Sequence, residues 1–532
     1  MSKRKIFIGL ALLLVLMMVL AVGCGKENAA ENTPEEPAAT PEEPVIEETG
    51  PAEKEPVWGG TLRIISAAGP TVLSYYPEMG PGDSGAVLGA AEMLVAVSND
   101  RTHEPQLAEW FEEDPEARTI TFKLREGIKF HDGTDLTADV VKWNYESYIQ
   151  KLMFNDLLKE IEVVDDYTLV FHVHEWHNQL LPNWGYTPIF SREAYEKNGG
   201  AEWARTNIVG TGPFMLEEWK RDVHMIWVKN PNYWREGPYL DRIEITYIPE
   251  ATTAAAKMEA GEADIWLSAP PQYVRELEDK GFVRQSGWAG AYYHLMPNTM
   301  DPNSPFNDLR VREALEYAID KQAICDALGY GYTSPLHAVA AEGEWGGRSE
   351  PVRPYNPEKA RELLAEAGYA DGLKVTLLAS VSDGGRNDTA EALANYLNDA
   401  GFIVELDIAD AGRFLQDVFV NGWKDLVIMY SGTDMNYLVS AHRWFGPQPM
   451  TNLASFRRPP ELVELFNESL KAFTLEEQKA ATEKIVDYMT EQALIIPLFQ
   501  SPGAFLHNGK VHTSYMKHGF TRWDHHDMWL EQ

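Results

Sequence analysis

The stretch KVTLLASVSDGGRNDTAEALANYLNDAGFIVELDIADAGRFLQDVFVNGWKDLVIM, residues 374–429, decides the fold class. It contains three short apolar runs whose length and composition are typical of buried strands. Two helical patterns separate these runs; Asp388 is the expected cap of the first, Gly401 ends it, and Gly422 ends the second. Strands and helices that alternate in this order predict a βαβαβ unit with parallel strands and right-handed crossovers. We expect the strands at Lys374–Leu378, Phe402–Leu406 and Leu426–Met429, and the helices at Thr389–Ala400 and Phe414–Val420.

Parallel strands end at the same edge of a sheet, and α/β proteins usually bind their ligands at that edge. Two loops should reach it, SVSDGGR at Ser380–Arg386 and SGTDMN at Ser431–Asn436. The second loop follows a strand that we expect to break at Ser431-Gly432, and it carries an acid, Asp434. The sequence therefore predicts a ligand site around Asp434. Polar and aromatic neighbours of this acid along the chain are Tyr430, Tyr437, His442, Arg443 and Trp444.

The first residues of the chain have the pattern of an export signal. Lys3–Lys5 precede an uncharged apolar run, Ile6–Gly23, and Cys24 follows. Such a pattern is typical of a secretory signal, and Leu20–Cys24 resembles a lipobox, in which the cysteine becomes the lipidated first residue. The alternative is an uncleaved transmembrane anchor, because the apolar run is just long enough to span a bilayer. Either way, we expect the rest of the chain outside the cytoplasm.

Residues 26–56 have the composition of a disordered tether. They contain ten Glu, two Lys and several Pro, with almost nothing to bury. Without this segment and the three basic residues of the leader, the net charge of the chain changes from −35 to −30. Such an acidic body does not bind nucleic acid non-specifically, so we expect no nucleic-acid partner.

The body of the chain carries a series of short motifs between residue 59 and its C-terminus. In chain order they are FKLREGIKFHDGTDLTADVV (122–141), VGTGPF (209–214), KNPNYW (229–234), EAGEAD (259–264), VREALEYAID (311–320), YNPEKA (355–360) and IPL (496–498). Together they resemble the solute-binding lipoproteins of oligopeptide, dipeptide and nickel ABC importers, which form extracellular solute-binding protein family 5. The resemblance covers the whole body and says little about the ligand.

This resemblance implies an α/β, two-lobed periplasmic-binding-protein-like fold (type II-like) with an extra N-terminal subdomain. Two crossing strands, near Trp288–Asn298 and Ile495–Gly503, would join the lobes, and hinge closure would enclose the ligand. The expected segments are a signal peptide at 1–23, a lipidated tether at 24–56, lobe 1 at 57–92, the subdomain at 93–207, lobe 1 again at 208–292, lobe 2 at 293–498 and the return to lobe 1 at 499–532.

The resemblance also suggests roles for charged residues of the predicted site. In peptide-binding relatives, an acid just after this strand pairs with the α-ammonium group of the ligand, and Asp434 lies close to that position. A carboxylate enclosed with a cation forms a strong charge-assisted contact. The alternative is an aspartate that caps the loop, since Asp is common in turns. Arg443 could receive a ligand carboxylate, or it could be a surface arginine.

Aromatic residues are the further candidates for the site. Tyr430 stands where relatives often have an aromatic residue. Trp444 and Tyr437 could line apolar side-chain pockets, but each could equally belong to the core. Tyr75 and Tyr76, in a loop after the first strand of the body, are candidate walls of the opposite lobe.

Two other functions compete with peptide binding. The segment FHVHEWH would place His172 and His174 on one face of a strand, which is compatible with metal ligation, and more histidines follow Val511. These histidines would suit a nickel or metal-chelate receptor, or a membrane-anchored metal hydrolase, but the favoured interpretation is that they are exposed histidines near a domain edge. The chain has no G-x-S-x-G, P-loop, Rossmann or HExxH motif. With Cys24 lipidated, Cys325 has no cysteine partner, which excludes a disulfide.

We therefore expect a non-enzymatic receptor that captures a small solute, with a short peptide as the first candidate, and passes it to the permease of an ABC importer. It should be a monomer without a cofactor, lipid-anchored to the outer face of the cell membrane or in the periplasm.

Overall fold

A computed structural model describes most of the body of the chain. The described residues are 54–73, 87, 89–97, 101–148, 152–381, 386–434, 436–449, 452–514 and 525–531. Glu55–Gln532 forms one compact unit. Within the described ranges, no helix has the length and apolarity that crossing a membrane requires. The predicted leader, Cys24, Tyr75 and Tyr76 lie outside the described residues.

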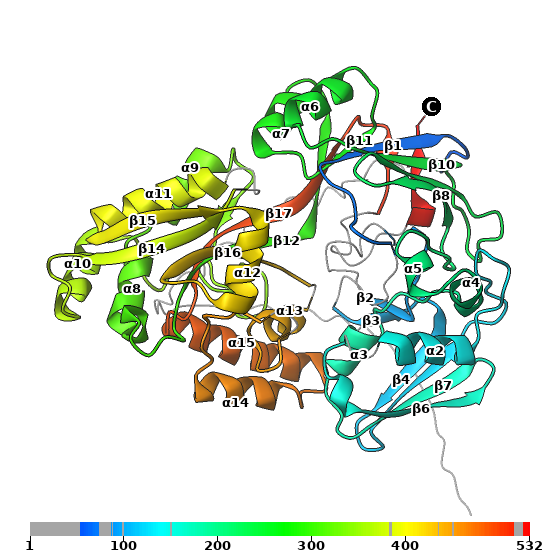
Figure 1. Cartoon of the computed structure of the whole chain (residues 1–532), viewed down its shortest axis with the longest axis horizontal. Coiled ribbons are helices and arrows are strands. Elements are labelled where there is room, and N and C mark those ends of the chain that lie inside the picture. Colours follow the sequence, from blue (N-terminus) through cyan, green and yellow to red (C-terminus); the bar gives the residue numbers. More distant parts are fainter. Residues whose placement is uncertain are drawn as a thin grey trace, which may run out of the picture. The chain divides into compact units, whose positions relative to one another are not determined.

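A mixed sheet of eleven strands runs through the body (Figure 1). Its two ends belong to two lobes, and β12 and β17 lie in its middle, paired antiparallel with each other. The predicted crossing segments therefore coincide with parts of these two strands, apart from Asn298 and Ile495, which lie one residue outside them. In sheet order the strands are β15 (Phe402–Ala409), β14 (Leu373–Ser380), β16 (Leu426–Gly432), β12 (Val283–Pro297), β17 (Ile496–His507), β11 (Ile265–Leu267), β1 (Thr61–Ser66), β10 (Arg242–Tyr247), β9 (His224–Lys229) and β8 (Phe214–Lys220), with β13 (Ser334–Pro335) beside β17.

The predicted βαβαβ unit is present in lobe 2. Strand β14 pairs in parallel with both β15 and β16, which confirms the predicted strand direction. The helical boundaries differ from the prediction. The first helix, α11 (Arg386–Asp399), begins two residues before Asp388, which lies in its first turn and is not its cap. The second, α12 (Ala411–Gln416), is capped by Asp410 and continues as a π-helical turn, Asp417–Asn421.

The other helices of the body surround these strands. Those of lobe 1 and its subdomain are α2 (Ala138–Tyr148), α3 (Leu180–Trp184), α4 (Arg192–Lys197), α5 (Ala201–Ala204), α6 (Ala251–Glu259) and α7 (Pro271–Glu278). Those of lobe 2 are α8 (Leu309–Tyr317), α9 (Lys321–Leu328), α10 (Pro357–Glu366), α13 (Tyr437–Phe445), α14 (Pro460–Ser469) and α15 (Leu475–Glu491). Short 3-10 turns lie at Asn155–Leu157, Pro305–Asn307 and His525–Asp527.

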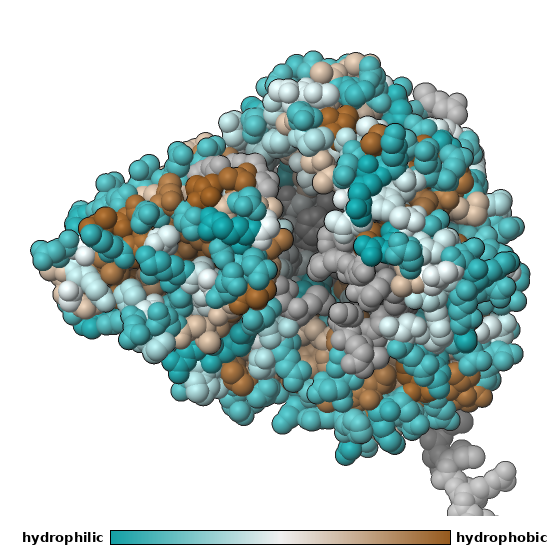
Figure 2. Space-filling model, viewed as in Figure 1, coloured by the Kyte–Doolittle hydropathy of each residue, from teal (hydrophilic) through white to brown (hydrophobic). Residues whose placement is uncertain are grey.

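Strand β15 is the free edge of the large sheet. Its side chains Ile403, Leu406 and Ile408 are exposed, and Figure 2 shows apolar side chains along this part of lobe 2. The strand also carries Glu405 and Asp407. Charged side chains on an edge strand discourage pairing with another chain.

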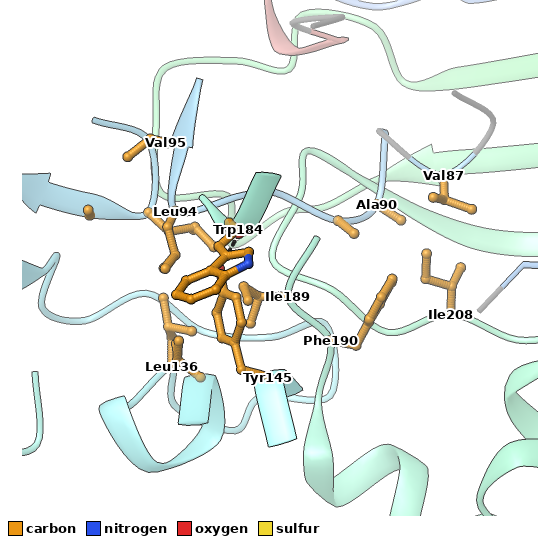
Figure 3. Close-up of a cluster of buried hydrophobic side chains, with 14 of the residues drawn as sticks. Val87, Ala90, Leu94, Val95, Leu136, Tyr145, Trp184, Ile189, Phe190 and Ile208 are labelled. Carbon is orange, nitrogen blue, oxygen red and sulfur yellow. Dashed lines mark hydrogen bonds between the residues drawn. The ribbon is translucent and has the colours of Figure 1, made fainter. Parts of the chain in front are cut away.

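The subdomain has a sheet of its own, and its apolar core is continuous with that of lobe 1. Its sheet has the order β4-β5-β7-β6, and α2 and α3 contribute to the core beside it (Figure 3). Trp184 lies in this core beside Tyr145, whose hydroxyl donates to the Trp184 carbonyl oxygen. The strands are β4 (Ala108–Asp114), β5 (Thr119–Leu124), β6 (Leu158–Asp165) and β7 (Thr168–Val173); two small ladders, β2 (Val95–Val97) with β3 (His103–Pro105) and β18 (Val511–His512) with β19 (Trp529–Leu530), complete the fold.

Two of the family motifs meet at one buried carboxyl group. Glu92 accepts hydrogen bonds from Thr211 Oγ1 (2.9 Å), Tyr233 Oη (2.9 Å) and Trp234 Nε1 (2.7 Å). VGTGPF supplies the threonine, and KNPNYW supplies both aromatic donors. These motifs are therefore structural in this chain, because they satisfy a carboxyl group that is buried in lobe 1.

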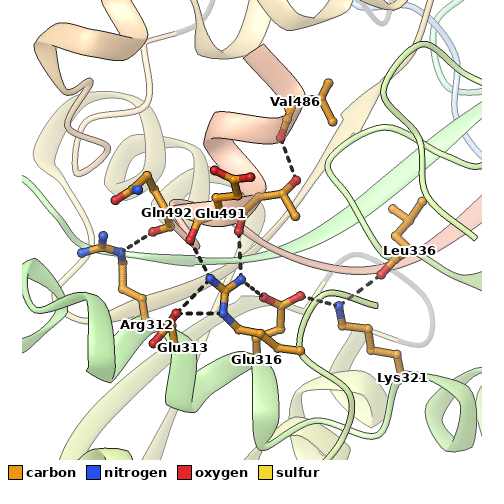
Figure 4. A network of polar contacts seen from close by, with 10 residues as sticks. Arg312, Glu313, Glu316, Lys321, Leu336, Val486, Glu491 and Gln492 are labelled. Atoms are coloured by element: carbon orange, nitrogen blue, oxygen red, sulfur yellow. Dashed lines mark hydrogen bonds and ion pairs between the residues drawn. The ribbon is translucent and has the colours of Figure 1, made fainter. Parts of the chain in front are cut away.

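The motif VREALEYAID has a similar structural role in lobe 2. Glu316, on α8, accepts from Arg353 (3.0 Å) and from Lys321 Nζ (3.2 Å), and all three side chains are buried (Figure 4). Arg353 also donates to the carbonyl oxygens of Thr490 and Glu491 at the end of α15. The network ties α8, α9 and α15 together.

Candidate ligand site

The predicted site lies where β16 ends and α13 begins. Strand β16 is paired with β12 as far as Gly432, which lies opposite Ala291. The expected break at Ser431-Gly432 is therefore wrong, because backbone pairing continues through both residues. Asn436 caps α13, and its Oδ1 accepts from the backbone N–H of Leu438 at 3.0 Å. Asp434 thus lies in a short connection between a buried strand and a helix start.

Asp434 is buried and held by two side chains of α13. Only 9% of its surface is exposed. Its Oδ2 lies 2.8 Å from a terminal nitrogen of Arg443 and accepts from Ser440 Oγ at 3.1 Å. The hydroxyl oxygen of Ser440 in turn accepts from the backbone N–H of Asp434 at 2.7 Å. Ser440 and Arg443 are three residues apart, so they lie on one face of the helix.

The ion pair does not use all the hydrogen-bonding capacity of its members. The contacts of the Asp434 side chain are made through Oδ2. Arg443 Nε is buried and has no hydrogen-bond partner among the described residues. Buried polar atoms in folded proteins are nearly always paired, so an unpaired one indicates a site that a ligand or water completes.

A second buried carboxyl group, Glu344, lies near Asp434. Its Oε1 accepts from the hydroxyl of Tyr292 at 2.7 Å, and Tyr292 also hydrogen-bonds Thr433, the residue before Asp434. The pKa of Glu344 is raised to about 8, mainly by burial and to a smaller extent by the charge of Asp434, while the hydrogen bond from Tyr292 and the charge of Arg101 act in the opposite direction. Within the described ranges, its Oε2 has no hydrogen-bond partner. A group of this kind is a candidate for function.

Sequence reasoning did not find Glu344 or Tyr292. Tyr292 lies opposite Ser431 on the neighbouring strand, and its place follows from a pairing between residues 139 positions apart. Glu344 belongs to the segment EGEWGGR at 342–348, where three glycines around an acid and an aromatic residue are a weak signal of a special backbone. Gly343 and Gly346 adopt positive φ angles there.

A pocket of about 520 Å³ lies beside Glu344. Arg101, from the subdomain, and residues of lobe 2 line it together. The Arg101 guanidinium lies 5.3 Å from the ring centre of Trp345. The lobe 2 lining is Gly343–Arg348, Lys479, Glu483 and Asp487.

The aromatic candidates occupy different environments. Tyr437 is only 2% exposed, lies in the lobe 2 core, and donates its hydroxyl hydrogen to the carbonyl oxygen of Val339. Trp444 is half-buried at the edge of that core and donates from Nε1 to the carbonyl oxygen of Gly432 at 3.2 Å. Tyr430 is 40% exposed, with its ring 5.9 Å from that of Tyr293. The structure thus brings Asp434 and Arg443 together, whereas Trp444 contacts the strand end at Gly432 and Tyr437 takes the core alternative.

The histidines considered above as metal ligands do not converge in the described part of the chain. His172 lies on β7, where its Nε2 is 2.9 Å from Glu162 Oε2, whereas His174 follows the end of that strand. His512 lies 2.7 Å from Glu531 and stacks on Trp529. Over the described ranges, no three His, Cys, Asp or Glu residues are grouped so that they could hold a metal ion.

Comparison with known proteins decides the family. The model of bacterial extracellular solute-binding proteins, family 5 Middle, matches residues 102–450. The chain belongs to this family. Its members are non-catalytic solute-binding proteins, so the prediction that this solute-binding protein is not an enzyme is confirmed.

Two curated relatives show how far the similarity extends. Heme-binding protein A of Haemophilus influenzae is 33% identical over 303 residues, which are 51% of this chain and 55% of that protein, little more than half its length. Glutathione-binding protein GsiB of Salmonella paratyphi A is 28% identical over 380 residues, 68% of this chain and 72% of that protein.

Solved structures confirm the predicted fold class. The ABC transporter-associated periplasmic binding protein DppA of Helicobacter pylori, in complex with the peptide STSA, superposes with a TM-score of 0.79 at 22% identity, over 90% of this chain and 99% of that one. NikA of Brucella suis, in complex with Fe(III)-EDTA, gives a TM-score of 0.78 at 22% identity, over 89% and 100%. This solute-binding protein therefore has the two-lobed α/β fold of periplasmic binding proteins.

Proposed function

We propose that this solute-binding protein captures a short peptide with a free α-ammonium group and delivers it to the permease of an ABC importer. Asp434 carries the proposal. Its carboxylate is buried at the carboxyl end of β16, where ligands of α/β proteins bind. The contacts of its side chain are made through Oδ2. A ligand ammonium group would complete the site with a charge-assisted hydrogen bond to Oδ1.

Arg443 and Glu344 give the proposed site two further functional groups. Arg443 orients Asp434 from α13, and its buried Nε is free to donate to a ligand carbonyl or carboxylate group. Glu344 offers its unpaired Oε2. A protonated carboxyl group there donates a hydrogen bond, and an ionised one accepts from a cation. Together these groups suit a ligand with both cationic and acceptor atoms, as a peptide has.

We further propose that capture takes place by closure of the two lobes about β12 and β17. The segments are those predicted above: lobe 1 at 57–92, 208–292 and 499–532, the subdomain at 93–207, and lobe 2 at 293–498. A monomer anchored through lipid on Cys24, with residues 25–56 as tether, would hold the site at the outer face of the membrane or in the periplasm. Tyr75 and Tyr76 stay candidate walls of lobe 1.

A second candidate function is binding of haem or another metal chelate. The name of the Haemophilus influenzae relative supports it, and so does the similarity to a structure that holds Fe(III)-EDTA. Glutathione, the ligand in the name of the Salmonella relative, belongs with the peptides in chemical terms.

A thermal-shift series separates these ligands. The unfolding midpoint of the purified protein is measured with di- to pentapeptides, their N-acetylated forms, glutathione, haemin, nickel and nickel with chelator. A ligand at a hundred times its Kd stabilises the folded state by about 2.7 kcal/mol. We expect free peptides to raise the midpoint and N-acetylated peptides to leave it unchanged. A shift by haemin or nickel alone contradicts the peptide proposal.

A pair of variants tests the role of Asp434. Asp434→Asn removes the charge at the proposed ammonium contact, and Asp425→Asn makes the same change at the other end of the strand, where Asp425 Oδ2 accepts from the backbone N–H of Thr376 at 2.9 Å. Calorimetric titration with the peptide that gives the largest shift should show at least about a tenfold loss of affinity for the first variant only. Equal losses contradict a specific role for Asp434.

A further inference from the structure

The subdomain contacts lobe 2 at a place distinct from β12 and β17. The segment Trp176–Gln179, which follows β7, lies against the turn Ser469–Phe473 at the end of α14; Figure 1 shows α3 and α14 at this place. We name this contact the clasp. Asn178 is its centre. Its side-chain amide donates to the carbonyl oxygens of Ser469 (2.7 Å) and Ala472 (2.8 Å). Its backbone N–H donates to the carbonyl oxygen of Leu470 (3.0 Å).

Apolar side chains surround these hydrogen bonds. Leu470 is buried and belongs to the hydrophobic cluster that otherwise consists, among the described residues, of side chains from lobe 1 and its subdomain. The rings of Trp176 and Phe473 lie 5.4 Å apart, and those of Phe154 and His442 lie 6.4 Å apart. The clasp therefore buries apolar surface from both sides and excludes water from its hydrogen bonds.

A second contact joins the same two parts of the chain. Arg101, just before β3, donates to the carbonyl oxygen of Gly343 at 3.4 Å and stacks over Trp345. These two contacts come from the 93–207 segment, while the hydroxyl of Tyr332 in lobe 2 donates to Glu278 in the 208–292 segment.

The clasp has the chemistry of a contact that can form and break. Asn178 binds carbonyl groups at and just after the end of α14, where helical partners run out. The carbonyl oxygen of Ser469 also accepts from the backbone N–H of Ala472 at 3.2 Å. When the clasp opens, water can bind the same carbonyl groups and the Asn178 amide, so each hydrogen bond is exchanged for another of similar strength. The strands β12 and β17 connect the lobes through the continuous chain. The clasp has no such connection, because Asn178 and Ser469 are 291 residues apart in sequence.

We propose that the clasp is a reversible contact by which the subdomain holds lobe 2 in the closed arrangement before any ligand binds. The proposal rests on lobe closure, which is part of the proposed function. It assigns a role to the subdomain, because a clasp that favours closure raises the fraction of ligand-free molecules that are already closed. Ligand binding then increases the closed fraction by a smaller amount.

Distance measurements without ligand test this proposal. Spin labels are placed at Glu116→Cys in the subdomain and Glu358→Cys in lobe 2, both exposed, in a full chain that carries Cys24→Ser and keeps the buried Cys325. Pulsed electron resonance then gives the distribution of distances between the labels. We expect Asn178→Ala to lower the ratio of closed to open molecules about tenfold, the equivalent of one to two hydrogen bonds.

Asn198→Ala is the matched control, because its side chain donates to the carbonyl oxygen of Ala194 within the subdomain, away from the clasp. It should leave the distribution unchanged. Phe473→Ala, which removes a half-exposed ring from the clasp, is the second test variant and should shift the distribution in the same direction as Asn178→Ala.

Three results overturn the clasp. One is a distribution for Asn178→Ala that coincides with that of Asn198→Ala. If Asn178→Ala does not fold, the absence of a shift for Phe473→Ala is the second. The third is an unmodified protein whose labels already lie at the open distance. Because no ligand is used, failure of the peptide proposal leaves this test intact, and failure here leaves peptide binding intact.

Discussion

Two buried charge clusters in lobe 2 differ in how completely they are paired. Around Glu316, both carboxylate oxygens are used, and Arg353 and Lys321 each also donate to backbone carbonyl groups. Around Asp434, the described contacts leave Arg443 Nε and Glu344 Oε2 buried without hydrogen-bond partners. The first cluster joins helices, while the second follows the end of a central strand.

This difference teaches how the two clusters can be told apart by function. A saturated network has no capacity left for a ligand, and its removal damages the fold. An unsaturated cluster costs stability, and binding of a polar ligand recovers that cost. Unpaired buried atoms therefore distinguish the Asp434 cluster from the Glu316 cluster, whereas buried charge alone does not.

The largest expected effect is on the saturated network. Glu316→Gln leaves Arg353 and Lys321 buried without a full negative charge between them, so we expect a loss of about 3–5 kcal/mol in the free energy of unfolding. Urea denaturation measures it. Glu313→Gln, on the same helix but at the exposed side of Arg353, is the control and should cost clearly less. Equal losses in the free energy of unfolding for the two variants would contradict the view that full pairing of Glu316 stabilises the fold.

A smaller loss of stability, with a loss of binding, is expected at the strand end. Arg443→Gln removes the cation from Asp434, and we expect a cost of about 1–3 kcal/mol in urea denaturation, because the carboxylate loses a partner while it stays buried. The affinity for the best peptide should fall by about tenfold or more, since Asp434 loses its orientation. Unchanged affinity would show that Arg443 is structural only.

The pH dependence of stability should reveal Glu344, the second buried carboxyl group of the Asp434 cluster. The pKa of Glu344 is about 8 in the folded protein and near 4.5 in the unfolded chain, so the folded state keeps a proton that the unfolded state releases. This contribution to stability is present below pH 4.5 and is lost as the pH rises to about 8. The slope is at most about 1.4 kcal/mol per pH unit. Glu344→Gln should remove it; an unchanged slope between pH 5 and 8 contradicts the raised pKa.

At lower pH, two buried histidines have the opposite effect. Burial lowers the pKa of His294 and of His442 to about 3, from 6.5 in the unfolded chain. Their contribution to stability is present above pH 6.5 and is lost as the pH falls toward 3, because the unfolded state takes up protons first. Both effects can be separated in one titration of the urea midpoint, since only the low-pH loss should persist in Glu344→Gln.

The smallest effect is expected for an exposed ion pair of the same chemistry. Arg413 pairs with Asp407 at the surface of lobe 2, with about two-fifths of each side chain exposed. Arg413→Gln should change the free energy of unfolding by less than about 1 kcal/mol, because water screens exposed pairs. Comparison with Arg443→Gln, the same substitution at a buried pair, isolates the effect of burial. A cost as large as that of Arg443→Gln would refute this explanation.

Much of the fold could be predicted from the sequence because its signals are local. The apolar runs and glycines of residues 374–429 indicate three strands and two helices, and parallel pairing of β14 with its neighbours confirms the order. Helix starts were less accurate: Asp410 caps α12 although the apolar pattern begins at Phe414. Ser431 and Gly432 looked like a break, but pairing with β12 holds both in the strand, and such pairing leaves no local signal.

The sequence by itself determined the strand–helix order, the family motifs and the place of Asp434 after a buried strand. Only the tertiary structure decided what surrounds that acid. Arg443 and Ser440 face it because α13 turns back over the strand end, and Glu344 is near it because Tyr292 lies on the adjacent strand. Helical and strand periodicity arise between near neighbours in the chain, whereas burial and pairing of charges depend on segments that meet only when the sheet has formed.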